Sequence, residues 1–245
     1  MCTVSWLVAP DRYEVFANRD EKRTRGAALP PEVREGRGVR FLAPRDADFG
    51  GSWIATNEFG VTVTLLNRAA APARPPIRSR GILVTVLAAC RGVEEVSASL
   101  AAEAAGDFAA FTLAVFEPGR SPAVFEWTGS GAISRISRAD SFLTSSSFDP
   151  AGVAEARSSV FRAAWRGGAA PGREDLLSLH RSHRPEPGPY SVCMHRDDAE
   201  TVSFTHVSVG PGAVSQLYVS GAPCRSGPGT LTRLPVRASG EALRC

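Results

Sequence analysis

The chain opens with MCTVSWLVAPDRYEVFANRDE (residues 1–21), and the architecture is inferred outward from these residues. Two apolar runs, residues 3–9 and 13–17, flank Pro10-Asp11-Arg12, whose residue types favour a turn. The pattern predicts a β-hairpin that begins at the N-terminus. Cys2 would then lie at the outer end of the first strand, and the polar residues 18–21 would end the hairpin.

Apolar runs predict further strands and helices along the chain. Alternation and turn signals predict strands at residues 39–42, 53–56, 61–66, 111–116, 123–127, 132–136, 191–195, 201–209 and 216–220. Helical spacing predicts helices at residues 81–91, 93–105, 152–165 and 174–180. Residues 25–38 predict a surface loop, and the tail after about residue 222 is predicted to be loosely ordered. Hairpins interleaved with helix pairs indicate an α+β sandwich, two sheets covered by helices on the outside.

Composition narrows the class of protein. The chain has 245 residues, of which 43% are hydrophobic, enough for a substantial core, and we expect one domain over residues 1–245. The net charge of +3 is spread over scattered side chains, which argues against a nucleic-acid partner. We expect a cytoplasmic protein, because a secretory signal and an apolar run of the ~18 residues that a membrane helix needs are both missing. Abundant Arg, Ala, Gly and Pro indicate a GC-rich bacterial genome.

Motif searches exclude several kinds of catalysis. Lys22 is the only lysine, and it lacks the glycines of a P-loop. Its charged neighbours also argue against a pyridoxal-type Schiff base. The sequence contains no Gly-x-Ser-x-Gly elbow, no His-Glu-x-x-His zinc helix and no Gly-x-Gly-x-x-Gly dinucleotide turn.

Cysteine usage indicates reduced thiols. The five cysteines are an odd number, lie far apart and form no Cys-x-x-Cys, which argues against a disulfide framework and against a zinc ribbon. Cys90 follows an apolar run, and we interpret it as a small buried hydrophobic residue.

Histidines outside these motifs are interpreted as structural. His180 and His183 lie near the end of a predicted helix beside arginines, and we interpret them as a solvated basic helix end rather than as metal ligands. Cys193 and His195 alternate on a predicted strand, with His206 expected on a neighbouring strand. A soft-metal site is conceivable there, but core packing is the commoner use, and we predict no metal site.

Cys2 is the strongest candidate for a nucleophile. Removal of Met1 would place a thiol and a free α-amine on one residue. An α-amine has an unperturbed pKa of ~7.7–8, so it can accept the thiol proton and later return it to a leaving amine.

Three further motifs accompany Cys2 and suggest a family. These are NRDE (residues 18–21), GGSW (50–53) and NEFG (57–60), the last of which leads into LLN (65–67). Together they resemble the NRDE-motif family, also called the transport-and-Golgi-organisation family. That family is similar to the choloylglycine hydrolase and penicillin acyltransferase group of N-terminal-cysteine enzymes. YSVCMH (190–195), TVS (201–203) and GAPC (221–224) more loosely resemble closing strands of the acyltransferase branch. The resemblance implies the αββα four-layer fold of N-terminal-nucleophile hydrolases.

The resemblance also implies roles for individual residues. Cys2 would attack a carbonyl carbon, and Asn67 matches an asparagine that donates to the oxyanion in choloylglycine-type enzymes. Arg19 and Asp20 would orient and tune the thiolate and the amine. Relatives have the order Arg-Asn-x-Asp, and Asn18 and Arg19 stand in a different order here, so either Asp20 or Glu21 could hold the α-amine.

Another departure concerns the segment after the central strands. Relatives carry an asparagine there, whereas residues 143–148 offer only hydroxyls, and Ser146 is the candidate weaker donor.

These features support two classes of function. The leading hypothesis is an amide-bond hydrolase or acyltransferase that acts on a small-molecule or peptide amide through a Cys2 thioester and needs no cofactor. A biosynthetic tailoring enzyme would differ mainly in its acceptor. The alternative is a non-catalytic haem or lipid trafficking protein, in which Cys2, Cys193, His195 and His206 could supply ligands for haem iron.

Overall fold

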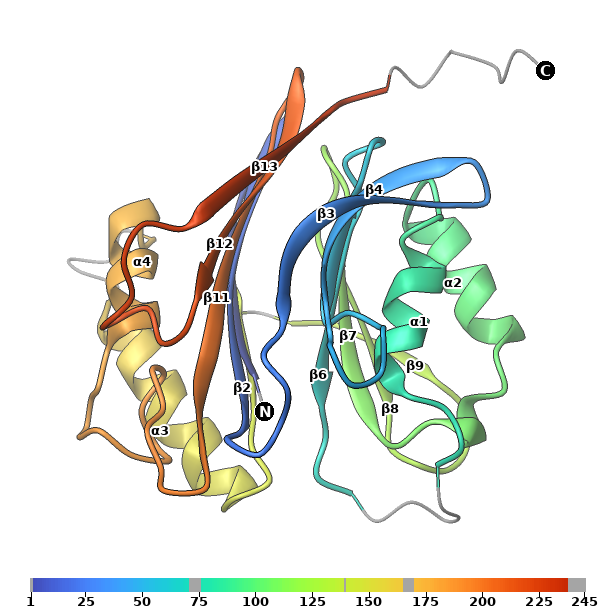
Figure 1. Cartoon of the computed structure of the whole chain (residues 1–245). Helices are drawn as coiled ribbons and strands as arrows, with labels where there is room; N and C mark the ends of the chain where they lie inside the picture. Colours follow the sequence, from blue (N-terminus) through green and yellow to red (C-terminus); the bar gives the residue numbers. More distant parts are fainter. Residues whose placement is uncertain (1, 71–75, 139, 165–169, 238–245) are drawn as a thin grey trace.

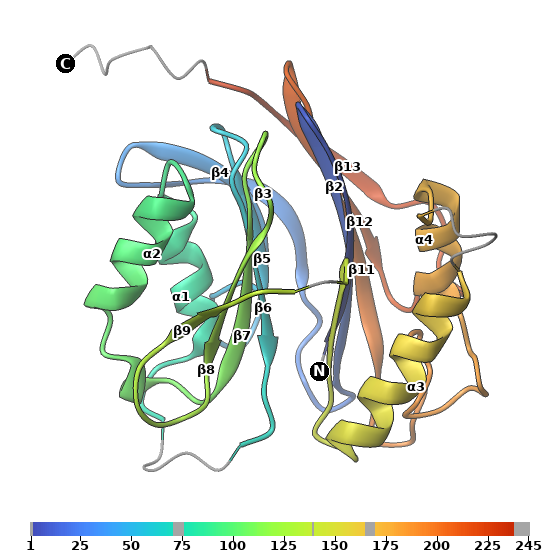
Figure 2. The same ribbon diagram turned by 180° about the vertical axis from the view of Figure 1, so that it is seen from behind.

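Two antiparallel sheets lie face to face, and a pair of helices covers the outer face of each sheet (Figure 1 and Figure 2). The computed structural model describes residues 2–70, 76–138, 140–164 and 170–237. The order of layers is helices, sheet, sheet, helices, which confirms the predicted αββα sandwich.

The six-stranded sheet combines the start of the chain with its last third. Its order is β10-β1-β2-β11-β12-β13. The strands are β1 (Cys2–Ala9), β2 (Arg12–Lys22), β10 (Phe142–Ser145), β11 (Ala199–Val209), β12 (Ala213–Ser220) and β13 (Thr230–Pro235). β1 and β2 form the predicted hairpin, but β2 runs on through residues 18–21 because both of its edges are paired, with β1 and with β11. The NRDE motif is therefore part of a central strand and not a polar turn.

The seven-stranded sheet follows the order of the sequence, from β3 to β9. The strands are β3 (Leu29–Gly36), β4 (Val39–Arg45), β5 (Ile54–Asn57), β6 (Thr62–Asn67), β7 (Phe111–Phe116), β8 (Ala123–Trp127) and β9 (Ser134–Ile136). Both β7 and β8 have the predicted bounds. Residues 25–38 were predicted as a loop, and this was wrong for residues 29–36, which form β3. β3 is an edge strand, so its prolines and exposed charges are compatible with pairing along one side only.

Among the described residues, four helices lie near their predicted positions: α1 (Arg80–Leu87), α2 (Val93–Ala102), α3 (Pro150–Ala163) and α4 (Arg173–Arg181), with a short 3-10 turn at Ala105–Asp107. α1 and α2 cover the seven-stranded sheet, and α3 and α4 cover the six-stranded sheet (Figure 1). None of the described helices combines the length and the apolar character needed to cross a membrane.

Three apolar clusters fill the three spaces between the four layers. The cluster beneath α1 and α2 includes Phe41, Leu83, Leu87, Val96 and Phe111. The cluster between the two sheets includes Val4, Trp6, Val15, Leu66 and Phe116. The cluster beneath α3 and α4 includes Phe16, Phe142, Phe161, Leu176 and Phe204. Because apolar side chains of each sheet contribute to two clusters, both faces of each sheet are buried, as a sandwich with helical outer layers requires.

Three short segments differ from the sequence prediction. β10 was not predicted, and β13 pairs with β12 within the tail that was predicted to be loosely ordered. Residues 191–195, predicted as a strand, form bends with a single bridge from His195 to Glu200. The Val192 carbonyl accepts from the Asn18 side chain of β2, and the Cys193 N–H donates to the carbonyl of Ser182, just after α4. Residues 238–245 lie outside the described residues.

Candidate active site

Cys2 is the first residue of β1 and is held from both sides by neighbouring strands. It lies opposite Arg19 of β2 and opposite Ser145 of β10. The backbone N–H of Cys2 donates a hydrogen bond to Ser145 Oγ at 3.3 Å. The Cys2 side chain is 8% exposed, so it is largely buried but reaches a cavity.

A cavity of about 260 Å³ lies at this end of the two sheets. Cys2 lines it from the six-stranded sheet, and Asn67, the last residue of β6, lines it from the seven-stranded sheet. The remaining lining residues are Arg19, Asp20, Glu21, Arg25, Asp46, Phe49, Ser52, Trp53, Leu65, Ser79, Arg80 and Gly81. The geometry therefore brings together the two residues that the sequence assigned to nucleophile and oxyanion donor.

Alternation along β2 divides the NRDE motif between the two faces of the sheet. Residues directly opposite each other in an antiparallel pair point to the same face, so Arg19 faces the cavity with Cys2. Glu21, two residues further along, shares this face and is within 3.4 Å of the Arg19 guanidinium. The structure thus favours Glu21 over Asp20 as the carboxylate on the side of the cysteine.

Asp20 borders the cavity, but its carboxylate is engaged beneath the helices. Arg157 of α3 donates to Asp20 Oδ2 at 3.2 Å, and Thr201 Oγ1 donates to Asp20 Oδ1 at 2.6 Å. Both side chains of the Asp20–Arg157 ion pair are fully buried. This engagement makes Asp20 a link between β2, β11 and α3, and its charge also raises the pKa of the Cys2 thiol.

Asn18 also faces the helices instead of the cavity. Its Nδ2 donates to the backbone carbonyls of His180 and Val192, at 2.9 and 3.0 Å. Its Oδ1 lies 3.0 Å from His180 Nδ1, and Ser5 Oγ lies 2.9 Å from His180 Nε2. His180 is fully buried, so interpreting it as a solvated helix end was wrong. His180 lies on the buried face of the amphipathic helix α4, and Ser5 and Asn18 provide hydrogen-bond partners for both of its ring nitrogens.

Arg19 is fixed by an anion and by an aromatic ring. Its Nη2 lies 2.7 Å from Asp46 Oδ2, and its guanidinium carbon lies 4.4 Å from the centre of the Trp53 ring. Asp46 also binds Arg25 at 2.7 Å. The positive charge near Cys2 is therefore held in place, and much of it is balanced by carboxylates of the same cavity.

The glycines of GGSW allow a close backbone contact that closes one side of the cavity. A Cβ on Gly51 would lie 2.7 Å from the carbonyl oxygen of Gly81 and 2.8 Å from its Cα, so only glycine fits there. Ser52 N–H donates to the Gly81 carbonyl at 3.0 Å. This contact fixes the start of α1, and with it Arg80, at the cavity wall.

The hydroxyls that bond to the Cys2 backbone belong to Ser145 and Thr144 and not to Ser146. Ser146 Oγ donates to the Phe148 carbonyl at 2.7 Å and accepts from the Phe148 N–H at 3.0 Å, and it lines the two neighbouring cavities. Sequence reasoning missed Ser145 because the register between β1 and β10, which places it opposite Cys2, has no local sequence signal. It also missed Asp46 and Arg80, which belong to none of the motifs.

Burial dominates the acidity of Cys2. Removal from water raises the pKa of the thiol, Asp20 and Glu21 raise it further, and Arg19 opposes them. The thiol is therefore protonated at neutral pH in this environment and needs a base before it can attack a carbonyl carbon.

Of the other residues considered as haem ligands, Cys193 and His195 lie close together, and His206 lies elsewhere. Cys193 Sγ lies 3.7 Å from His195 Nε2. His206 instead pairs with Glu14 at 2.7 Å and stacks on Phe16. Together with Cys2 at its own cavity, these positions do not form one haem pocket. Cys90 is buried, as predicted.

Comparison with known proteins finds one family and a set of solved structures. Residues 1–150 match the family model described as Transport and Golgi organisation 2. The C2A variant of conjugated bile acid hydrolase from Clostridium perfringens is 13% identical, with a TM-score of 0.54 over 96% of this chain and 92% of that chain. An N-acylethanolamine-hydrolyzing acid amidase ortholog from Caenorhabditis elegans is 11% identical, with a TM-score of 0.58 over 84% of this chain and 92% of that chain. No curated protein matches. At these identities the structures share the N-terminal-nucleophile hydrolase fold with this chain.

Proposed function

The chain belongs to the Transport and Golgi organisation 2 family, and from that membership together with the cavity around Cys2 we propose that it is an N-terminal-cysteine amide hydrolase or acyltransferase. One observation carries the proposal: Cys2 and Asn67, contributed by different sheets, line the same cavity. A buried thiol facing an amide donor across a small polar cavity is the arrangement that acyl transfer through a thioester needs.

The first half of the reaction forms the thioester. Once Met1 is removed, the α-amine of Cys2 takes the thiol proton while sulfur bonds to the substrate carbonyl carbon. The carbonyl oxygen becomes an oxyanion, and Asn67 donates a hydrogen bond to it. The carbon–nitrogen bond then breaks, and the leaving amine takes the proton from the Cys2 ammonium.

The second half releases the acyl group. Water, or an acceptor amine, gives a proton to the Cys2 α-amine as it attacks the thioester carbon. The carbon–sulfur bond breaks, and the sulfur takes the proton back. We propose that Glu21 holds the ammonium form, since it lies on the face of β2 that carries Arg19, opposite Cys2.

Charges in the cavity suggest the class of substrate. Arg19 and Arg25 both pair with Asp46. Arg80 forms no ion pair with any described residue, and its Nη1 donates to a backbone carbonyl, that of Ala110, at 2.8 Å. Arg80 can therefore bind an anionic group, and we expect an amide whose acyl or amine part carries a carboxylate.

The test uses the full-length protein and a panel of chromogenic N-acyl anilides, half of which carry a carboxylate. Intact-mass analysis first establishes whether Met1 has been removed. We expect turnover of at least one carboxylate-bearing anilide, complete loss in Cys2→Ala, and loss of activity in Asn67→Ala of about 10²–10³-fold, as for other oxyanion donors. Arg80→Gln should affect the carboxylate-bearing anilides more than the neutral ones.

Labelling with iodoacetamide provides a second readout that does not depend on finding the substrate. Peptide mapping should show that Cys2, which reaches the cavity, is alkylated faster than Cys90, and Cys90→Ala serves as the control because that thiol is buried outside the cavity. Equal hydrolysis by wild type and Cys2→Ala would contradict the proposal, as would a mature protein that keeps Met1 and yet remains fully active.

A further inference from the structure

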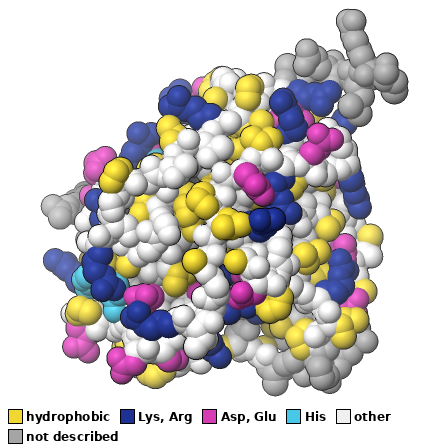
Figure 3. All heavy atoms as spheres, viewed as in Figure 1, with side chains coloured by type: hydrophobic (Ala, Val, Ile, Leu, Met, Phe, Trp, Pro, Cys, Tyr) yellow, Lys and Arg dark blue, Asp and Glu magenta, His cyan; other side chains and the backbone are white. Residues whose placement is uncertain are grey.

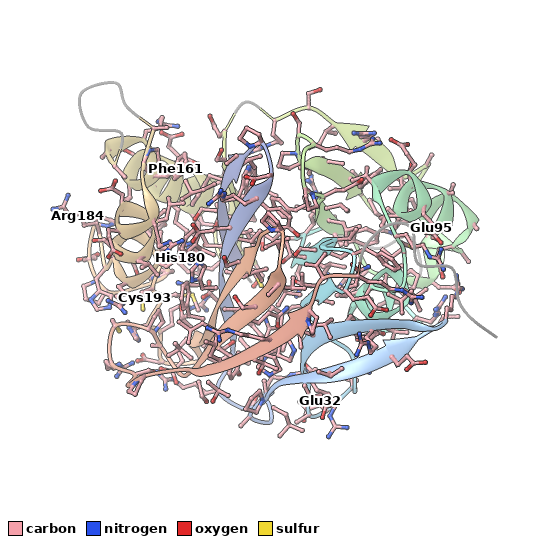
Figure 4. All side chains as sticks on the ribbon, turned by 90° about the horizontal axis from the view of Figure 1, so that it is seen from above. Glu32, Glu95, Phe161, His180, Arg184 and Cys193 are labelled. Atoms are coloured by element: carbon pink, nitrogen blue, oxygen red, sulfur yellow. The ribbon has the colours of Figure 1, made fainter. Side chains whose placement is uncertain are left out.

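Four potential metal ligands converge at a place remote from Cys2. They are His183, Cys193, His195 and Cys224, and one ligand atom from each lies within 4.8 Å of the others. His183 follows α4, Cys193 and His195 precede β11, and Cys224 follows β12. Figure 4 shows Cys193 on the side of the molecule where α3 and α4 lie, near His180. Histidine atoms reach the surface on this side of Figure 3, next to Lys and Arg side chains.

The three distances from His195 to the other ligand atoms are close to those around a tetrahedral ion. His195 Nε2 lies 3.2 Å from His183 Nε2, 3.3 Å from Cys224 Sγ and 3.7 Å from Cys193 Sγ. Bonds of about 2.3 Å to sulfur and about 2.0–2.1 Å to nitrogen place the ligand atoms of a tetrahedral zinc site roughly 3.3–3.8 Å apart. Two histidines and two cysteines are also a ligand set that zinc favours.

Burial at the cluster suits a site enclosed by protein. Cys193 is fully buried, and the other three ligands, His183, His195 and Cys224, are partly buried. A divalent ion would bind two thiolates and two neutral imidazoles, release two protons and leave the cluster with no net charge.

We propose that these four residues form a closed, structural zinc site. All four positions of a tetrahedral ion would be filled by protein, which leaves none for substrate and distinguishes a structural from a catalytic site. The ion would connect the end of α4, the segment before β11 and the turn after β12. Sequence analysis did not identify the site, because the four ligands have no compact spacing and the segment that carries Cys193 and His195 was expected to pack in the core.

The segment that the zinc ion would fix also supports the candidate active site. Its backbone carbonyl at Val192 accepts from Asn18 Nδ2, and its carbonyl at Pro189 accepts from Arg157. Met194 N–H donates to Thr201 Oγ1, which in turn donates to Asp20. The ion would therefore stabilise the wall behind β2 without touching the cavity.

One neighbour must move when the metal binds. Arg225 Nη2 donates to His195 Nδ1 at 2.6 Å, whereas an imidazole that binds zinc through Nε2 carries its proton on Nδ1. Glu200 Oε2, 3.9 Å from Nδ1, is placed to accept that proton. The Arg225 side chain is 64% exposed, so it can swing away and keep its ion pair with Glu200.

Cobalt binding to the full-length protein tests the proposal. Reduced protein is freed of metal with a chelator and titrated with Co²⁺. One Co²⁺ per chain should give the visible bands of a tetrahedral site and a thiolate charge-transfer band, and Zn²⁺ should remove both. Cys224→Ser and His183→Gln should lose these bands, or bind at least about tenfold more weakly, since even changes to neighbours of metal ligands have effects of that size.

Three variants serve as controls that should bind cobalt as wild type does. They are Cys90→Ser, His206→Gln and Cys2→Ala, and the last separates this proposal from the proposed catalysis. Circular dichroism checks that each variant is folded. If both ligand variants fail to fold, X-ray absorption of the zinc-loaded wild type decides, with two sulfur and two nitrogen neighbours expected. Wild type that binds no metal in reduced form, or ligand variants with unchanged spectra, would overturn the proposal.

Discussion

Single side chains of β2 alternate between two tasks. Arg19 and Glu21 face the cavity of Cys2, whereas Asn18 and Asp20 hold the helices against the back of the sheet. The sequence predicted that the four residues act together, because they form one motif. It could not predict the division, because the direction of each side chain depends on how far the strand continues, and the polar composition indicated that it would end before residue 18.

The two carboxylates of the motif should therefore respond differently to substitution. Asp20→Asn leaves Arg157 as an unpaired buried charge, and we expect it to lower the free energy of unfolding by about 3–5 kcal/mol. Glu21→Gln removes only partly exposed ion pairs and should change stability by less than about 1 kcal/mol. Urea denaturation of both variants measures this difference.

Substitution of Glu21, a positioning residue in the proposed reaction, should lower activity far more than it lowers stability. We expect Glu21→Gln to lower kcat/KM by about 100-fold, at the lower end for groups that serve proton transfer. Since a neighbouring carboxylate raises the pKa of an amine, its loss should also shift the acidic limb of the rate profile to lower pH. A Glu21→Gln variant with an unchanged pH profile, or one less stable than Asp20→Asn, would contradict these roles.

Buried His180 should make stability depend on pH. Desolvation, followed by His206 and Arg157, lowers its pKa from 6.5 to about 3, so the folded protein keeps it neutral while the unfolded chain protonates it. The unfolded state then binds more protons below pH 6.5, and stability falls as pH drops from there towards 3. This contribution amounts to at most about 1.4 kcal/mol per pH unit.

A His180→Gln variant isolates this effect from the titration of carboxylates. Glutamine can still bond to Ser5 and Asn18 but cannot titrate. Urea denaturation at pH 7.5, 6 and 5 should show a steeper loss of stability for wild type than for the variant. Parallel curves would mean that His180 does not provide this pH dependence.

At the scale of elements, local patterns predicted the strongly apolar strands and missed those defined by their partners. β7 and β8 are mostly apolar, with one polar residue each, and were predicted with their bounds. β3, β10 and β13 are short or polar edge strands, and each is fixed by pairing with a neighbour. The four-residue β10 nevertheless matters most for the site, since it places Ser145 opposite Cys2.

Substitution of Gly51 tests the contact between the loop before β5 and the start of α1. Gly51→Ala would force its Cβ against the Gly81 backbone, which cannot move without shifting α1. We expect a loss of stability of about 1–3 kcal/mol, together with reduced activity because Arg80 moves. Gly212→Ala is the matched control, since a Cβ there meets nothing within 4 Å. Thermal denaturation compares the two, and equal midpoints would show that the contact is not needed.

For the whole molecule, the two sheets differ in how they are assembled from the sequence. The seven-stranded sheet is built from strands that follow one another in the sequence, with α1 and α2 inserted between β6 and β7. The six-stranded sheet joins β1 and β2 to strands that follow much later, and β2 pairs with β11 from Tyr13 opposite Val209 to Lys22 opposite Ala199. Pairing between such distant segments leaves no local signal, so the αββα class was predictable from the alternation of elements and from the resemblance, but the strand order was not.

This assembly predicts that residues 1–150, the part that matches the family model, do not fold alone. The missing part supplies five buried side chains of the cluster beneath α3 and α4, and five of the cluster between the sheets. Burial of each of these ten side chains contributes about 1.5–3 kcal/mol to the free energy of unfolding. Their combined loss exceeds the total stability of about 5–15 kcal/mol of a typical domain. A fragment of residues 1–150 should show no cooperative thermal transition by circular dichroism, and residues 151–245 added in trans should restore one. A cooperative transition of the fragment by itself would mean that the seven-stranded sheet and its two helices are sufficient for folding, and that the six-stranded sheet assembles onto them afterwards.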